Sequence, residues 1–341
     1  MKKIFLTLLL PLLLVLSGCN TQAAMGQNEN SSGNKENLKI SMLNIGHGDS
    51  LLIQTPEQTI LIDTANTNEH AKLVNELEKF SVTKIDKLII THPHIDHIGG
   101  ARMLICPTEK HLAEFPYLKK ISVAEAYDNG IPSTGTAYRN YLSAVESMSV
   151  KRHSLKVGDE LDFGGGVKFK VLWPPKNFVD EMKAGKADKD DKDYKMNNSS
   201  IVGRLTYGNF AMMFTGDCEK ESEAKIVAGN DAKDLKCNVL KAGHHGSRTS
   251  STVNFLRAVD PEYVLISAGD KEEHGNAKGS PHLRPLEKIL AQGVDPKKIF
   301  CTRWNGTITV TSDGKTFSVT PEIQADWVED WMEKKRKLNT T

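Results

Sequence analysis

The sequence has few cysteines, no excess of charge of one sign and no repeated unit. Five cysteines occur among 341 residues, and no two have the Cys-x-x-Cys spacing of a structural zinc site. The formal net charge of +1 gives no electrostatic argument for a nucleic acid or an acidic partner. No glycine-rich nucleotide-binding loop is visible. Because the hydrophobic content of 39% is enough for a core, we expect a globular protein whose chemistry lies in local motifs.

The N-terminus predicts export. Residues 1–3 are Met-Lys-Lys and residues 4–16 are almost wholly apolar, which indicates a signal peptide over residues 1–18. Residues 16–19, Leu-Ser-Gly-Cys, resemble the cleavage box of bacterial lipoproteins. The resemblance implies cleavage before Cys19, lipid on its thiol, and an extracytoplasmic protein anchored to the bacterial cell membrane. The alternative is a plain secreted protein.

The rest of the chain predicts a tether followed by one domain. Residues 19–36 are rich in Gln, Asn, Ser and Gly, so we expect a flexible tether there and a single domain over residues 37–341. Apolar alternation and continuous apolar runs predict strands near residues 38–45, 50–53, 59–64, 87–90, 167–173, 201–205, 210–214, 239–241, 263–267, 306–310 and 316–319. Helical spacing predicts helices near residues 69–80, 101–104, 137–148, 219–228, 286–291 and 321–337. The Lys/Asp-rich run 183–195 predicts a solvated loop.

The four cysteines of that domain leave their pairing open. The four cysteines are Cys106, Cys218, Cys237 and Cys301. Outside the cytosol they could form disulfides, and four cysteines allow three connectivities. Cys218 could equally be a small buried side chain.

The densest group of metal-capable side chains lies in residues 91–100, Thr-His-Pro-His-Ile-Asp-His-Ile-Gly-Gly. The apolar run before it indicates a buried strand, and the glycine pair after it lets the backbone pass close to its surroundings. His92 and His94 alternate, so at a strand end they can point to the same side. Asp96 and His97 are adjacent and point elsewhere. We therefore predict two neighbouring metal ions, one on each pair, with ligands that suit zinc, manganese or iron.

His-x-His-x-Asp-His after an apolar strand resembles the signature of the metallo-β-lactamase superfamily. The resemblance implies an α/β fold of four layers, αββα, in which two sheets pack face to face with helices outside and a one- or two-metal site lies at one edge. Asp63, at the end of a predicted strand, matches the superfamily's first motif. That match implies that Asp63 orients the metal-site loop through hydrogen bonds.

Two further segments resemble one branch of the superfamily. That branch contains the extracytoplasmic hydrolase domain of ComEC-type DNA-uptake channels and secreted phosphorylcholine esterases. Residues 46–49, Gly-His-Gly-Asp, look like its "VGQGD" turn, with His47 in place of the usual Gln and at most at the substrate edge. Residues 197–199, Asn-Asn-Ser, look like its "N-x-S" element, where many other members place a histidine ligand.

The resemblance continues at the ends of two later strands. Asp217, after the strand at 210–214, matches the aspartate that bridges two metals, and a carboxylate has two oxygens for two cations. Residues 244–247, His-His-Gly-Ser, resemble the same branch. By that analogy His245 is a metal ligand and His244 contacts a phosphate oxygen or acts as general acid; the reverse order remains open.

The last ligand expected from the family is a histidine before a helix. His282 keeps the His-to-Pro spacing of the family's "HPxP" element and is the choice here, with His274 as the alternative. In the resulting arrangement His92, His94 and His245 hold one ion. The other ion is held by Asp96, His97 and His282, and Asp217 bridges the two.

The implied activity is two-metal hydrolysis, with two divalent ions, zinc first and manganese second. A shared water loses a proton between the ions, and the hydroxide attacks phosphorus or carbonyl carbon, with Asp96 and His244 as the catalytic group. The leading interpretation is an extracytoplasmic phosphodiesterase or nuclease that acts on DNA. Cell-wall or phosphorylcholine diesters come next, then β-lactams or thioesters. A non-catalytic surface binding protein is the alternative that is not an enzyme.

Overall fold

The structure, a computed structural model, describes residues 37–186, 195–270 and 279–339, and all of these belong to one compact unit, Lys35–Thr341. The expected signal peptide, Cys19, the tether and His274 lie outside the described residues, as does most of the Lys/Asp-rich run. Among the described residues no helix is long and apolar enough to cross a bilayer.

The first sheet of the described chain has eight strands in the order β15-β14-β1-β2-β3-β4-β5-β6. Neighbours from β15 to β3 pair antiparallel, whereas β3 to β6 pair in parallel. The strands are β1 (Leu38–Met42), β2 (Leu51–Gln54), β3 (Thr59–Ile62), β4 (Lys84–Ile89), β5 (Ser122–Asp128), β6 (Lys151–Ser154), β14 (Ile308–Ser312) and β15 (Phe317–Pro321).

The second sheet has seven described strands in the order β13-β12-β11-β10-β9-β8-β7. Its neighbours from β7 to β10 pair antiparallel and those from β10 to β13 in parallel, so both sheets change direction of pairing once. The strands are β7 (Glu160–Asp162), β8 (Lys168–Trp173), β9 (Val202–Tyr207), β10 (Phe210–Phe214), β11 (Val239–Lys241), β12 (Tyr263–Ile266) and β13 (Ile299–Cys301).

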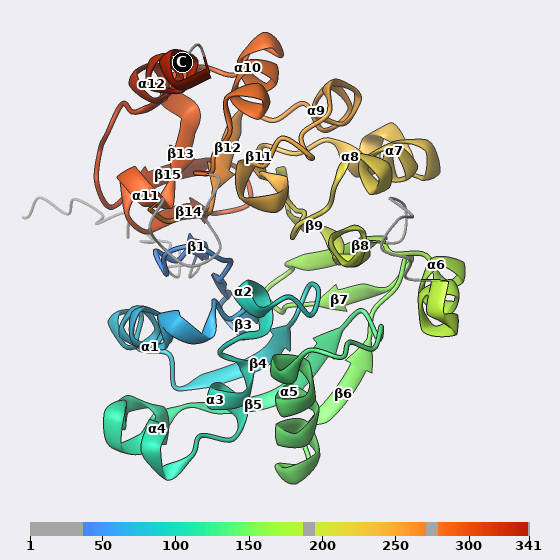
Figure 1. Cartoon of the computed structure of the whole chain (residues 1–341), viewed down its shortest axis with the longest axis vertical. Helices are drawn as coiled ribbons and strands as arrows, with labels where there is room; N and C mark the ends of the chain where they lie inside the picture. The colour runs from blue at the N-terminus through green and yellow to red at the C-terminus, as the bar shows by residue number, and fades with distance from the viewer. Residues whose placement is uncertain (1–36, 187–194, 271–278, 340–341) are drawn as a thin grey trace, which may run out of the picture. The chain divides into compact units, whose positions relative to one another are not determined.

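Helices connect the parallel strands and lie on the outer face of each sheet (Figure 1). Those on the side of the first sheet are α1 (His70–Lys79), α2 (Ile95–Ile98), α3 (Ala101–Ile105), α4 (Glu109–Glu114) and α5 (Thr136–Ser147). Those that follow are α6 (Lys176–Glu181), α7 (Lys220–Gly229), α8 (Ala232–Leu235), α9 (Val253–Val259), α10 (Leu283–Ala291), α11 (Thr302–Asn305) and α12 (Val328–Asn339).

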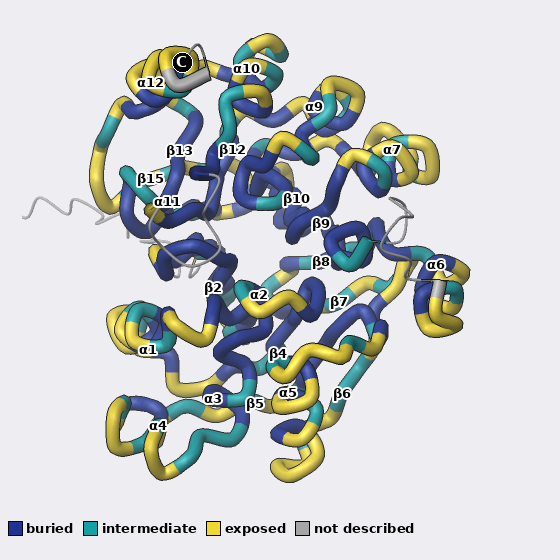
Figure 2. The backbone as a smooth tube through the Cα atoms, viewed as in Figure 1, coloured by how far each residue is buried: buried dark blue, intermediate teal, exposed yellow. Residues whose placement is uncertain are grey.

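Three apolar clusters fill the spaces between the layers. Side chains alternate along a strand, so Ile60 and Ile62 join the cluster between the two sheets while Leu61 faces the helices. From the second sheet Met212 enters the inner cluster, whereas Met213 packs under the helices of its own side. Figure 2 shows the same pattern, with buried strands and helices that expose their outer faces. The order of layers is therefore helix, sheet, sheet, helix, and the predicted αββα sandwich is confirmed.

The prediction for the last helix was wrong at its start. A helix was expected over residues 321–337, but α12 begins at Val328. Pro321 ends β15 instead, and the side-chain amide of Asn305 donates to the carbonyls of Ile323 and Ala325. These bonds keep the segment out of a helix, since a helix would use the same carbonyls internally. Trp327, placed on that helix by the prediction, precedes it and is buried, as is Trp331.

The cysteines of the described residues are unpaired. Cys218, Cys237 and Cys301 are buried, and Cys106 is half-buried. Cys218 is only 1% exposed, which agrees with the prediction of a small buried side chain.

Candidate metal centre

The turn that carries the predicted histidines follows β4 and is held tightly against the chain after β3. His94 precedes the single-turn helix α2, and the glycine pair comes directly after that helix. A Cβ on Gly99 would lie 2.5 Å from the backbone nitrogen of Thr67, and a Cβ on Gly100 would lie 2.5 Å from the carbonyl oxygen of Thr64. The glycine pair is therefore required by the close approach of backbone to backbone, which places the ligand turn against the loop after Asp63.

Four of the predicted ligands form one group, which we call the four-residue group: Asp96, His97, Asp217 and His245. One ligand atom from each lies within 4.8 Å of the others. His97 Nε2 is 3.2 Å from Asp217 Oδ1, and His245 Nε2 is 3.4 Å from that oxygen. His245 Nε2 is also 3.3 Å from Asp96 Oδ2. Two imidazole nitrogens and two carboxylates thus face one point, as in a single metal site.

The second group, the three-residue group, consists of His92, His94 and Asp217. His92 Nε2 lies 3.0 Å from His94 Nδ1 and 4.0 Å from Asp217 Oδ2. Asp217 therefore presents Oδ1 to one group and Oδ2 to the other, which is how a carboxylate bridges two cations. This grouping differs from the expected one, because His245 lies with Asp96 and His97 instead of with His92 and His94.

The polar atoms at the four-residue group lack partners of their own. His97 Nε2, His245 Nε2 and Asp217 Oδ1 are buried and have no hydrogen-bond partner among the described residues. Buried polar atoms are nearly always paired, so imidazole nitrogens and a carboxylate oxygen left without partners at one point fit the binding of a cation. The opposite ring nitrogens are occupied: His97 Nδ1 lies 2.8 Å from Asp63 Oδ2, and His245 Nδ1 lies 2.9 Å from the Ser267 carbonyl. Such contacts fix the tautomer that leaves Nε2 free for a metal. The donor set thus fits divalent ions such as zinc.

The pKa shifts of His97 and Asp217 also fit the binding of a cation. Burial disfavours the charged form of His97, but the carboxylates of Asp217 and Asp63 raise its pKa well above the usual range. Burial acts equally against the charge of Asp217, and the imidazoles of His245 and His97 nevertheless hold its pKa well below the usual range. A carboxylate that stays ionised when buried is suited to bind a cation.

Asp63 lies beneath the ligand turn. Its side chain accepts hydrogen bonds from the backbone nitrogen of Thr91 at 2.7 Å and from the Thr91 hydroxyl at 2.7 Å. With the contact to His97 Nδ1, these bonds tie the end of β3 to the start of the turn after β4. Asp63 has a positive φ of 61°, a conformation uncommon for residues other than glycine, and such strain is typical of functional sites.

A buried ion pair that sequence reasoning missed lies under the same histidines. Asp49 and Lys241 are 0% and 1% exposed, and the Lys241 ammonium contacts Asp49 Oδ2 directly. Asp49 Oδ1 is 3.4 Å from His245 Nδ1, and Lys241 Nζ also donates to the Gly216 carbonyl at 2.8 Å. Burial opposes ionisation of Asp49, but Lys241 and His245 lower its pKa to about 2. The signal for Asp49 was its place in the Gly-His-Gly-Asp turn, whereas Lys241 gave none because it ends an apolar strand.

His244 lies at the rim of the site. It is half-exposed, with Nε2 3.8 Å from Asp217 Oδ2 and Nδ1 3.0 Å from the Thr249 hydroxyl and 3.2 Å from Glu219 Oε1. Both His244 and His245 have positive φ, 49° and 51°, so the backbone turns sharply between them. This turn sends one imidazole into the four-residue group and the other toward solvent, and Glu219 was not foreseen as its partner.

The other two predicted histidines lie beside the groups. His47 is buried, and its ring centroid is 4.6 Å from that of His245. Burial, together with the charge of His245, lowers the pKa of His47 to about 3. His282 precedes α10, and its backbone nitrogen donates to the Gly246 carbonyl at 2.9 Å. Among the described residues it belongs to neither metal-capable group that contains Asp217, so its assignment as a ligand stays a prediction.

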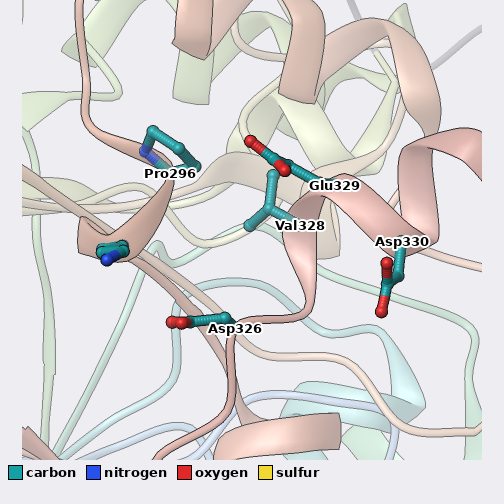
Figure 3. A pocket seen from close by; sticks show the side chains of 6 residues that line it. Pro296, Asp326, Val328, Glu329 and Asp330 are labelled. Carbon is teal, nitrogen blue, oxygen red and sulfur yellow. The ribbon is translucent and has the colours of Figure 1, made fainter.

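A pocket at the start of α12 lies apart from these residues (Figure 3). It is lined by Pro296, Lys297, Asp326, Val328, Glu329 and Asp330, and none of the predicted ligands is among them. The volume is about 170 Å³.

The metal-capable turn after β4 and the αββα layers point to a class of protein, the one whose family model the sequence matches. Residues 43–187 match the family described as the metallo-beta-lactamase superfamily. The chain therefore contains a domain of that superfamily, and it resembles the ComEC-type branch.

Two curated relatives support that branch. The chain is 29% identical over 303 residues to ComE operon protein 3 of Bacillus subtilis (strain 168), covering 83% of this chain and 34% of the relative. It is 27% identical over 256 residues to the competence protein ComA of Neisseria gonorrhoeae, covering 75% of this chain and 30% of the relative. This chain thus spans about a third of the length of these relatives.

Among solved structures, the metallo-beta-lactamase fold protein YhfI from Bacillus subtilis aligns with this protein over 80% of this chain and 100% of the YhfI chain. The TM-score is 0.47 and the sequence identity 12%.

Proposed function

We propose that the chain is a metal-dependent phosphodiesterase that binds two divalent ions, zinc first, and hydrolyses DNA outside the membrane. The observation that carries the proposal is the convergence of unpartnered buried atoms on Asp217. The carboxylate faces the four-residue group with one oxygen and the three-residue group with the other. Similarity to proteins named for competence supports a substrate related to DNA.

The protein's own residues would divide the work by position. His97, His245 and Asp96 would hold one ion, His92 and His94 the other, and Asp217 both. When bound, two such ions lower the pKa of a water and neutralise charge on the substrate oxygens. Asp63 and the Ser267 carbonyl keep His97 and His245 in the tautomer that binds.

His244 is the residue placed to handle the leaving group. It is the half-exposed histidine nearest Asp217, and Glu219 and Thr249 fix its ring from the other side. A histidine held in this way can donate a proton to the departing oxygen as bond cleavage proceeds. This role requires no rearrangement of the turn, because the ring already faces solvent beside the site.

The test is an activity screen of metal-reconstituted protein across DNA, RNA, phosphorylcholine esters and β-lactams, alongside a bis-aryl phosphodiester. Asp217→Ala and His94→Ala should abolish diester hydrolysis without unfolding the chain, as judged by circular dichroism. Asp231→Ala is the matched control, because Asp231 is exposed and pairs only loosely with Lys233 at 3.8 Å. Turnover like that of the wild type in Asp217→Ala, or hydrolysis confined to β-lactams, would refute the proposal.

The proposal includes a lipid anchor on Cys19, because residues 16–19 resemble a lipoprotein cleavage box and follow an apolar run typical of a signal peptide. Replacing Cys19 by Ala should release the protein from the membrane fraction. An unchanged distribution between membrane and soluble fractions would contradict the anchor and leave the hydrolase proposal intact.

A further inference from the structure

Cationic side chains lie beside the rim of the metal centre where His244 faces solvent. We call the four residues Lys220, Arg248, Arg284 and Lys288 the basic rim. Arg248 belongs to the turn that follows the two histidines, Lys220 begins α7, and the other two lie on α10. These segments are far apart in the sequence, so the fold itself brings the charges together.

Hydrogen bonds tie these segments to the histidine turn. The backbone nitrogen of Lys220 donates to the Thr249 carbonyl at 2.9 Å, and that of His282 donates to the Gly246 carbonyl at 2.9 Å. Lys288 Nζ donates to the Ser250 carbonyl at 3.4 Å. Figure 1 shows α7, α9 and α10 along one side of the second sheet. The start of α7 and the start of α10 therefore flank the turn that carries Arg248.

The charges of the basic rim act on one another. Burial lowers the pKa of Lys288; Glu223 raises it, and the charges of Arg284 and Lys220 lower it again. The pKa of His282 is lowered to about 4, mainly by burial and further by the charges of Lys335, Arg248 and His244. The side chains of the basic rim are thus close enough to influence one another, and an anion bound there would reduce their mutual repulsion.

Acidic neighbours offset the charge of the two lysines of the basic rim only in part. Glu221 lies 3.8 Å from Lys220, Glu287 pairs with Arg336 at 3.5 Å, and Glu223 is buried. Glu223 accepts backbone hydrogen bonds from Ser251 at 2.6 Å and Thr252 at 2.7 Å. Arg248 and Arg284 are exposed, and neither makes an ion pair with a described residue. Both guanidinium groups are therefore available for phosphate, which they can bind through two parallel hydrogen bonds.

We propose that the basic rim binds the phosphates of a single-stranded nucleic acid as the strand leaves the metal centre, so that the enzyme prefers a polymeric diester to a small one. This inference rests on the proposed phosphodiesterase function and names its substrate class. A membrane of anionic lipid could also attract basic side chains, but the basic rim borders the side chain that faces the leaving group. A nucleic acid strand bound at the centre must pass such a border, whereas a flat membrane need not.

The test compares Arg248→Gln/Arg284→Gln with the control Lys119→Gln/Lys315→Gln, which removes the same charge at exposed sites elsewhere. Binding of a labelled twenty-nucleotide oligothymidylate is measured by fluorescence anisotropy at several salt concentrations, with Asp217→Ala present in every protein to prevent cleavage. Each phosphate contact contributes about 0.7 to the slope of log affinity against log salt for a single strand. Loss of two contacts should therefore flatten the slope by about 1.4 and weaken binding about tenfold near physiological salt.

The same substitutions in the otherwise unmodified enzyme give a second readout. The kcat/KM for the oligonucleotide should fall about tenfold through KM, and the kcat/KM for bis-p-nitrophenyl phosphate should stay unchanged. Equal losses on both substrates, or an unchanged salt slope, would overturn the inference. So would a loss confined to vesicles of phosphatidylglycerol and phosphatidylcholine. If the oligonucleotide binds through the basic rim but no diester is hydrolysed, the proposed catalytic function fails and the binding surface stands.

Discussion

The buried pair of Asp49 and Lys241 gives the sharpest test of what holds the metal centre together. Lys241→Met keeps the aliphatic length of the side chain and removes the ammonium. Lys241 is the one ammonium that contacts Asp49 among the described residues, so the substitution leaves the buried carboxylate with only the imidazoles of His245 and His97 beside it. Breaking a buried pair from one side costs about 3–5 kcal/mol.

The matched comparison is an ion pair at the surface. Lys298 Nζ lies 2.7 Å from Glu262 Oε1, with the two side chains 35% and 46% exposed. Lys298→Met should cost far less stability than Lys241→Met, because water screens the pair. Burial, and not the presence of an ion pair, then accounts for the difference between the two variants.

The assay is urea unfolding of chelator-treated protein, followed by circular dichroism. With an m value of about 3 kcal/mol/M, Lys241→Met should lower the midpoint by roughly 1–1.7 M. The double variant Asp49→Asn/Lys241→Met should recover more than half of the loss, since it removes both charges. The reasoning is refuted if Lys241→Met costs no more than Lys298→Met, or if the two changes at the buried pair simply add.

Three further predictions concern metal, thiols and pH. Elemental analysis of the full chain should find about two transition-metal ions, and Asp217→Ala should lose both because its two oxygens face both groups; full occupancy in the variant would contradict the bridge. Peptide mapping after treatment with a thiol reagent at pH 8 should show Cys106 modified and Cys237 and Cys301 spared, because burial raises the pKa of both to about 12; modification of either buried thiol in folded protein would refute this. Burial lowers the pKa of His282 to about 4 in the folded protein. As pH falls, His282 is therefore protonated in the unfolded chain before it is protonated in the folded one. Its contribution to stability is present above about pH 6.5 and is lost toward pH 4; His282→Gln in metal-free protein should therefore show a smaller drop in urea midpoint between pH 7 and pH 5, and an identical drop would count against it.

The fold could be predicted mainly where local pattern and family motif agreed. Short apolar runs at the positions of β3 and β10 indicated buried strands, and the structure places them in the two sheets. The strand β5 was missed because its first half is exposed and its pairing with β4 and β6 is set by the sheet. The start of α12 was wrong because Asn305, distant in the sequence, competes for the carbonyls that a helix would use.

For the candidate site, too, some residues could be predicted from motifs and others only from the structure. Motif order identified Asp217 and His245, but no spacing in the sequence could tell which oxygen of Asp217 faces which histidine. The left-handed backbone at both His244 and His245 decides that His245 joins Asp96 and His97. Lys241 remained hidden because a lysine at the end of an apolar strand normally extends into water, and only packing of the two sheets covers it.

The candidate ligands come from both halves of the sandwich: His97 follows β4 of the first sheet, and Asp217 follows β10 of the second. An ion bound by both residues would link the two sheets. Binding of the ion and folding of the chain would then be coupled, because the ion binds only the folded state. Metal supply would then set how long the protein survives against proteases, as well as whether it can turn over substrate.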